Sequence, residues 1–180
     1  IAICMIVMNI YLIKHGNKMK QKYLLSTYNR QEVSFERGDN ATLLDIDGKE
    51  YIDFAAGVAV CSVGHGNHRL ARAISDQAAK IIHVSNLYRI APQEECARRI
   101  VELSEYDMRC FFGNSGTEVN EGAIKIARKY GEVEGRAKRY KIITLENSFH
   151  GRTITALKAT GQVAKHNYFG PYPDGFVYAA

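Results

Sequence analysis

The sequence lacks the features that mark unusual protein classes. Only 3 of its 180 residues are proline, and its 15 glycines follow no period, so collagen-like and other low-complexity chains are excluded. Repeats and long linkers are missing as well. Four cysteines, with no C-x-x-C pair, predict reduced thiols in a cytoplasmic protein: Cys4, Cys61, Cys96 and Cys110.

The composition is that of an ordinary globular protein. Apolar residues make up 46% and charged residues 24%, so the chain can bury enough apolar surface to fold, and its length fits one domain and a piece of another. The net charge of +5 is too small to indicate nucleic-acid binding without a clustered patch. The basic run Arg136, Lys138, Arg139 and Lys141 has one aromatic neighbour, Tyr140, and we interpret it as a solvated loop that leads into a strand. No nucleic-acid partner is expected.

The residues at both ends of the sequence suggest that neither end is a natural terminus. Residues 1–13 are apolar except for Asn9, a run too short to span a membrane, and the basic residues follow it, whereas a signal peptide has them first. We interpret residues 1–18 as a non-native or upstream extension, with synthesis starting near Met19, and expect no membrane partner; a membrane anchor is the alternative. The strand-like run at residues 175–180 shows no terminal signal, so we expect a truncated chain.

The first half of the chain predicts a small α+β segment. Residues 41–46 and 51–54 flank Asp47-Gly48 and predict a β-hairpin with a primed turn. Residues 55–63 predict a buried, turn-rich stretch. Residues 68–82 have helical apolar spacing, and a second helix is expected from Pro92, at its first position, to about Leu103.

The second half predicts a parallel α/β arrangement. Strands are expected at residues 108–112 and 139–145, a helix at 117–130 and a short helix at 153–160. The apolar face of the longer helix is expected to consist of Val119, Ala123, Ile126, Ala127 and Tyr130.

One motif lies where the first of these strands gives way to the helix. Free N–H groups at a helix start bind anions, Gly116 permits close approach, and the hydroxyls of Ser115 and Thr117 add donors, so this loop predicts a phosphate site. It lacks the Gly-Lys-Ser/Thr of a nucleotide P-loop. Ser115 and Glu118 also fit a simple capping box, and the motif by itself leaves both interpretations open.

A second motif follows the next strand and is expected at the same sheet edge. Phe149 could stack on a planar cofactor, and Arg152 could hold a carboxylate through two hydrogen bonds. A turn with one core Phe and one surface Arg is the plainer alternative.

Two other patterns carry little chemistry. Residues 63–69 resemble the start of a dinucleotide-binding loop, but Arg69 replaces its third glycine. His65, His68 and His83 could suggest a metal site, yet no acidic pair or cysteine completes it, and we expect no metal.

Taken together, these segments resemble the class III (subgroup II) pyridoxal-phosphate aminotransferases, and within them the acetylornithine aminotransferases most. "NSGTEVNEGAIKIARKY" (Asn114 to Tyr130) resembles their N-S-G-T/A-E-A-N-E helix, and "ENSFHGRT" (Glu146 to Thr153) their cofactor-stacking loop. Residues 45–68 and 83–104 are similar to their N-terminal region. The resemblance implies an incomplete fold-type I α/β fold, with residues 19–80 as an N-terminal α+β segment and 81–180 as the first part of the large cofactor domain.

The resemblance also implies roles for particular residues. Ser115, Gly116 and Thr117 would hold the phosphate of pyridoxal 5'-phosphate, with Phe149 against the pyridine ring and His150 nearby. Arg152 would pair with the substrate carboxylate, and Val58, Ala59, Ser85 and Asn86 would lie near the substrate pocket. The implied reaction moves an amino group from N-acetylornithine to 2-oxoglutarate, giving glutamate, in a cytoplasmic homodimer of arginine biosynthesis. Ornithine, succinylornithine and 4-aminobutyrate aminotransferases are alternatives within the class.

The family's two defining residues have no match in this chain. The Schiff-base Lys and the Asp that pairs with the pyridinium nitrogen belong to the C-terminal half of the fold, and the lysines present here do not match that motif: Lys125, Lys129, Lys158 and Lys165. We therefore expect the chain by itself to bind the cofactor weakly and not to turn over. A non-catalytic phosphate-ligand-binding or partner module is the rival interpretation.

Overall fold

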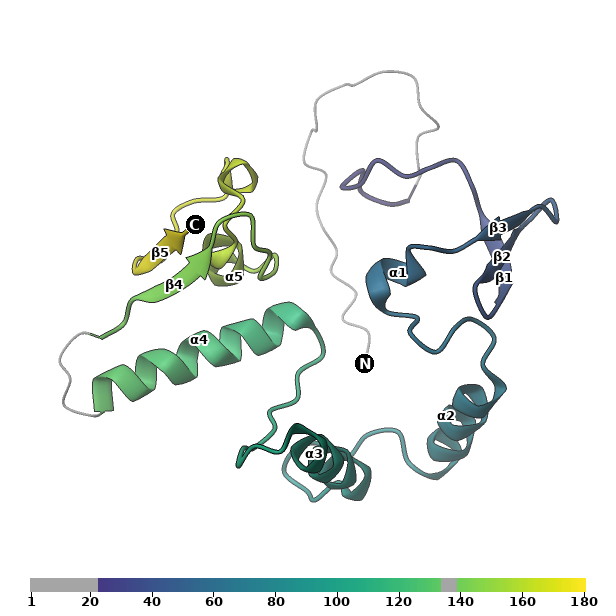
Figure 1. Cartoon of the computed structure of the whole chain (residues 1–180), viewed down its shortest axis with the longest axis horizontal. Helices are drawn as coiled ribbons and strands as arrows, with labels where there is room; N and C mark the ends of the chain where they lie inside the picture. The colour runs from purple at the N-terminus through teal and green to yellow at the C-terminus, as the bar shows by residue number, and fades with distance from the viewer. Residues whose placement is uncertain (1–22, 134–138) are drawn as a thin grey trace. The chain divides into compact units, whose positions relative to one another are not determined.

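The computed structural model describes residues 23–133 and 139–180, and the expected extension at 1–18 and the basic residues Arg136 and Lys138 lie outside them. The chain divides into two compact units, Ile1–His83 and Val84–Ala180, which are described separately (Figure 1). Among the described residues, none of the helices has the length and apolar character that crossing a membrane requires.

The first unit is built on an antiparallel sheet of β1 (Phe35–Asp39), β2 (Thr42–Asp45) and β3 (Glu50–Ile52), in that order. The predicted hairpin is confirmed, because Leu43 pairs with Tyr51 across the Asp47-Gly48 turn. The predicted primed turn is wrong: Gly48 has a φ of 80°, but Asp47 does not have the positive φ that a primed turn requires at its first central residue. β1 was not predicted from the sequence.

A left-handed turn and a helix follow the sheet. In α1 (Ala56–Ala59) the φ angles of Ala56, Gly57, Val58 and Ala59 are 45°, 64°, 61° and 64°. The turn-rich prediction for residues 55–63 is therefore right, but the expected burial is wrong, because Val58 is 91% exposed in this chain. α2 (His68–Lys80) is capped by Asn67, whose side chain accepts a hydrogen bond from Leu70 N, and it ends two residues before the predicted bound.

The second unit begins with α3 (Ala91–Ser104) and α4 (Gly116–Val133). The sequence predicted Pro92 as the first residue of α3, but the helix begins one residue earlier, at Ala91. The strand expected at residues 108–112 is wrong: this segment is neither helix nor strand. A strand is defined by its hydrogen-bonded neighbour, and no strand of the described residues pairs with this segment.

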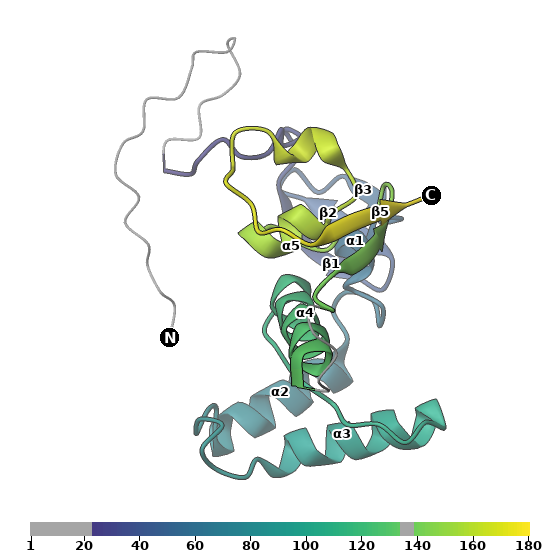
Figure 2. The ribbon, with the colours of Figure 1, turned by 90° about the vertical axis from the view of Figure 1, so that its left-hand side faces the viewer.

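The rest of the second unit is a parallel β–α–β arrangement. β4 (Ile142–Leu145) and β5 (Phe176–Ala179) pair in parallel, with Ile143 opposite Val177, and α5 (Ile154–Ala159) and the 3-10 helix η1 (Val163–His166) lie in the connection. Figure 2 shows β4 and β5 side by side with α5 next to them. The predicted parallel arrangement, the short helix and the strand-like C-terminal run are confirmed.

The small core of this unit forms where α4 packs against α5. Its buried apolar residues are Ile124, Ala156, Leu157 and Ala159. The predicted apolar face of α4 is wrong at four of its five residues in this chain: Val119 is half-buried, whereas Ala123 and Ala127 are exposed, as are Ile126 at 62% and Tyr130 at 57%. The more buried side of α4 is mostly polar and follows a helical stripe: Thr117, Asn120, Glu121, Ile124 and Arg128.

Candidate functional site

The start of α4 forms the hydrogen bonds of a capping box. Ser115 Oγ accepts a hydrogen bond from Glu118 N at 3.3 Å, and Glu118 Oε2 accepts one from Asn114 N at 2.6 Å, one residue before the usual partner. Ser115 and Gly116 are exposed and Thr117 is half-buried. A Cβ on Gly116 would meet no atom within 4 Å, so the backbone there is open to a ligand. The cap thus orders the helix start and leaves its outer surface available.

The structure brings the second motif against this helix start. Asn120 Nδ2 donates hydrogen bonds to Gly116 O inside α4 and to His150 O in the loop, both at 2.9 Å. Two hydroxyls, Thr117 Oγ1 and Thr153 Oγ1, lie 3.1 Å apart. Thr153 Oγ1 also donates to Glu121 Oε1 at 2.5 Å. These bonds join segments 36 positions apart in the sequence into one surface.

Gly151 permits this close approach. Its φ is 138°, and a Cβ there would lie 2.1 Å from Thr117 Oγ1 and 2.9 Å from Thr117 Cα. A contact below 3.0 Å with backbone forces the two segments apart. A glycine at this position is therefore a condition for the helix start and the loop to meet.

Phe149 and Arg152 lie together beside this surface. The Phe149 ring is 54% exposed, and the Arg152 guanidinium carbon lies 5.3 Å from its centroid. Lys165 Nζ, from η1, lies 5.6 Å from the same centroid. An exposed aromatic ring beside two cations suits a planar, anionic ligand.

His150 is placed by its backbone. Its N–H donates to Thr160 Oγ1 at 3.0 Å, while its Nε2 is buried and has no hydrogen-bond partner in the described residues. A buried polar atom of this kind is uncommon in a complete site, because leaving it unpaired costs free energy. The orphaned nitrogen, the open helix start and the exposed ring together fit a bound planar phosphate compound such as pyridoxal phosphate.

The predicted substrate-pocket residues lie on other elements of the chain. Val58 and Ala59 belong to α1 in the first unit. Ser85 and Asn86 form their own turn before α3, where Ser85 has a φ of 72° and its Oγ accepts from Leu87 N at 3.3 Å. The role of these residues in a substrate pocket therefore stays a prediction.

His65 has a partner that the sequence did not reveal. Its Nε2 lies 2.7 Å from Asp53 Oδ2, and both side chains are largely buried. Within residues 23–133 and 139–180, no three His, Cys, Asp or Glu side chains cluster as metal ligands would. The periodicity of the sequence gives no signal for this pair, since the two residues are joined by a loop.

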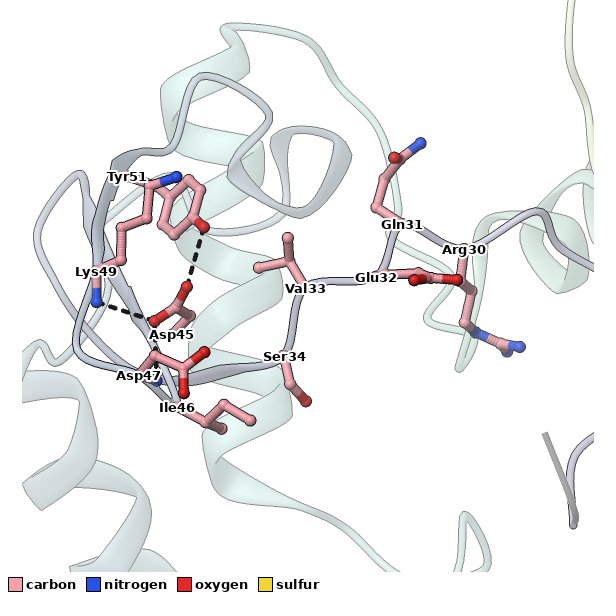
Figure 3. Close-up of a pocket in the computed structure, with 10 residues that line it drawn as sticks. All are labelled: Arg30, Gln31, Glu32, Val33, Ser34, Asp45, Ile46, Asp47, Lys49 and Tyr51. Atoms are coloured by element: carbon pink, nitrogen blue, oxygen red, sulfur yellow. Dashed lines mark hydrogen bonds between the residues drawn. The ribbon is translucent and has the colours of Figure 1, made fainter. Parts of the chain in front are cut away.

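A cavity of about 630 Å³ lies elsewhere in the first unit, between residues 30–34 and the β2–β3 hairpin (Figure 3). The Asp45 carboxylate at its wall accepts from Lys49 N and Tyr51 Oη at 2.9 Å and from Asp47 N at 3.0 Å. These hydrogen bonds, the one from Lys49 N most, hold the pKa of Asp45 below its usual range. The carboxylate therefore stabilises the hairpin.

The chain has relatives among known proteins. Residues 25–180 match the family described as aminotransferase class-III. The chain is 68% identical to acetylornithine aminotransferase of Wolinella succinogenes over 91% of its length and 51% identical to that of Caldanaerobacter subterraneus over 88%. It covers 42% and 40% of these two relatives.

Solved structures give the same result. An ornithine aminotransferase from Toxoplasma gondii superposes with a TM-score of 0.82 at 32% identity, over 88% of this chain and 37% of its own, and its structure has pyridoxal phosphate at partial occupancy. N-acetylornithine aminotransferase from Stenotrophomonas maltophilia superposes with a TM-score of 0.66 at 37% identity, over 84% and 36%. The chain belongs to the class-III aminotransferase family, whose cofactor is pyridoxal phosphate, and it has part of the α/β fold of these enzymes.

Proposed function

We propose that the complete protein is a pyridoxal-phosphate-dependent aminotransferase that takes the terminal amino group of N-acetylornithine and passes it to 2-oxoglutarate, as a step of arginine biosynthesis. The observation that carries this proposal is the joining of the α4 start to the 149–153 loop by the Thr117–Thr153 and Asn120–His150 contacts. The 68% identity to an acetylornithine aminotransferase supports the choice of amino donor.

Each residue at this surface has a task in the proposal. The backbone N–H groups at Ser115–Thr117 and their hydroxyls bind the phosphate, where the positive end of α4 favours an anion. Phe149, whose ring is exposed, would lie against the pyridine ring. Arg152 holds the substrate carboxylate through its planar guanidinium. The cofactor, once bound, supplies the electron-withdrawing ring that makes the substrate's C–H bond acidic.

Val58, Ser85 and Asn86 are proposed to line the substrate pocket of the complete protein. Val58 is suited to an apolar wall because its side chain is 91% exposed on the turn α1. The complete protein is proposed to be a cytoplasmic homodimer. Since no lysine here matches the family's reactive lysine, the 180-residue chain is proposed to bind the cofactor weakly and not to turn over.

The experiment is a titration of the complete protein with pyridoxal phosphate, followed by a transamination assay. We expect a visible absorbance band of bound cofactor, and glutamate formation from 2-oxoglutarate with N-acetylornithine. Ornithine, succinylornithine and 4-aminobutyrate are assayed beside it, because the structural likeness includes an ornithine aminotransferase. Absence of the band and of any transamination would contradict the proposal and favour a phosphate-binding module.

A further inference from the structure

The turn α1 combines two properties that require explanation. Three of its L-residues, Ala56, Val58 and Ala59, have φ between 45° and 64°, and it projects Val58 outward with 91% exposure. L-residues avoid this region because the Cβ approaches the following carbonyl, and a β-branched residue avoids it most. Backbone outliers of this kind persist only where neighbouring groups hold them, and they concentrate at functional sites.

Asp53 is the group that holds the beginning of the turn. Its Oδ1 accepts hydrogen bonds from Ala55 N at 3.0 Å and Ala56 N at 2.8 Å. Its Oδ2 lies 2.7 Å from His65 Nε2, so both carboxylate oxygens are engaged. The turn itself adds Ala59 N to Ala55 O and Val60 N to Ala56 O.

His65 is held in turn by the sheet. His65 N donates to Asn40 O at 2.8 Å and Asn40 N donates to His65 O at 2.9 Å. A Cβ on Gly38 of β1 would lie 2.8 Å from His65 Cβ, so the imidazole is packed directly on this strand. A continuous path of contacts therefore runs from the sheet through His65 and Asp53 to the turn that presents Val58.

We propose that Asp53 and His65 are positioning residues: their hydrogen bond fixes the left-handed turn α1, and the fixed turn sets how well the complete enzyme binds its amino donor at Val58. The second half of this statement rests on the proposed function, which places Val58 in the substrate pocket. Neither residue needs to touch the substrate or the cofactor.

The test compares three variants of the complete protein. His65→Leu removes the hydrogen bond, His65→Gln keeps an N–H near the position of Nε2, and His68→Leu is the matched control at the exposed first residue of α2. We expect His65→Leu to raise the KM for the amino donor about fivefold or more, with kcat and the cofactor band within about twofold of the parent. His65→Gln is expected to restore KM, and His68→Leu to leave it unchanged.

A second readout is independent of activity. Hydrogen exchange of the peptide that contains residues 55–61, followed by mass spectrometry, is expected to speed up about tenfold in His65→Leu and not in His68→Leu. Should His65→Leu fold poorly, Asp53→Asn replaces it, because Asn keeps one acceptor for the turn and loses the charge. Unchanged exchange and an unchanged KM in both variants overturn the proposal. If the parent transfers no amino group but His65→Leu still speeds up exchange in this peptide, the proposed function is contradicted, and only the first half of the proposal, the fixing of the turn by Asp53 and His65, stands.

Discussion

The two units hold their functional loops by different chemistry. In the first, a carboxylate–imidazole contact of 2.7 Å fixes a turn made of left-handed residues. In the second, hydroxyl and amide groups and the Glu121 carboxylate join α4 to the 149–153 loop, where Gly151 is the one residue of positive φ.

The two units differ in which residues adopt positive φ: L-residues in the turn α1, and a glycine in the 149–153 loop. Each L-residue in the left-handed region costs about 1–2 kcal/mol, and α1 has three of them. A hydrogen bond to a charged group is about twice as strong as a neutral one, which suits it to holding that turn. The loop in the second unit avoids the strain by using glycine, and its contacts to α4 combine neutral hydrogen bonds with one from Thr153 Oγ1 to the Glu121 carboxylate.

The largest effect is expected from Gly151→Ala, which replaces the glycine that adopts positive φ without strain in the second unit. The added Cβ would lie 2.1 Å from Thr117 Oγ1, so α4 and the loop must separate. We expect the free energy of unfolding of the complete protein to fall by about 2–4 kcal/mol, measured by urea denaturation. Gly170→Ala is the control, since its Cβ would meet only ordinary contacts at 3.8 Å or more. Equal stability of the two variants would show that the close approach is unnecessary.

Thr153→Val tests whether the Thr153 hydroxyl holds the start of α4 against the 149–153 loop. It removes the contacts to Thr117 Oγ1 and Glu121 Oε1 and the N-cap hydrogen bond from Ala156 N of α5, while keeping the shape of the side chain. We expect the Kd for pyridoxal phosphate to rise about tenfold, which is about 1.4 kcal/mol, in a titration of the absorbance band. Thr153→Ser keeps the hydroxyl and is expected to bind like the parent. Parent-like binding by Thr153→Val together with weak binding by Thr153→Ser would contradict the hydroxyl role and point to packing of the methyl group instead.

A pH dependence is expected for the first unit because of Asp53. The hydrogen bond from His65, followed by that from Ala56 N, lowers the pKa of Asp53. A carboxylate with a lowered pKa stabilises the folded state above its unfolded pKa, near 3.9, and loses that contribution as the pH falls through the folded value. The thermal midpoint of the parent should therefore drop more steeply than that of Asp53→Asn when the pH is lowered below about 4. Parallel pH profiles would contradict an ionic contact.

The smallest effect on stability is expected from removing an ion pair on α3, because the ion pairs there do not contact a loop with strained backbone. Glu95 accepts from Arg98 Nε and Arg99 Nε at 2.8 Å and 2.7 Å, and these hydrogen bonds lower its pKa to about 2. All three side chains are exposed, so water screens the attraction. Glu95→Gln is expected to change Tm by about 1 °C or less at pH 7, like its neighbour Glu94→Gln. A much larger drop would show that α3 is buried in the complete protein.

Much of the fold follows from local patterns in the sequence. The hairpin at Asp47-Gly48, α2 with its Asn67 cap, α4 and α5 all obey turn chemistry or helical spacing, and the structure confirms them. The segment 108–112 and the apolar face at Ile126 and Tyr130 do not follow, because a strand partner and a covering surface are supplied by other parts of a fold. Of the site, the residue types of the two loops are visible in the sequence, whereas the Asp53–His65 contact joins positions that no periodicity connects.

The sequence by itself determined the family, most of the helices, the hairpin and the residue types of the two loops proposed to hold the cofactor, because these depend on residue types at short spacing. The tertiary structure alone decided that Thr117 meets Thr153, that Asn120 meets His150, and that Asp53 fixes a left-handed turn. Such contacts join residues that are far apart in the sequence, so they depend on how the elements pack together in three dimensions. The scarcity of proline and the lack of a glycine pattern do not predict these contacts, yet Gly151 is the residue that permits the 149–153 loop to approach Thr117.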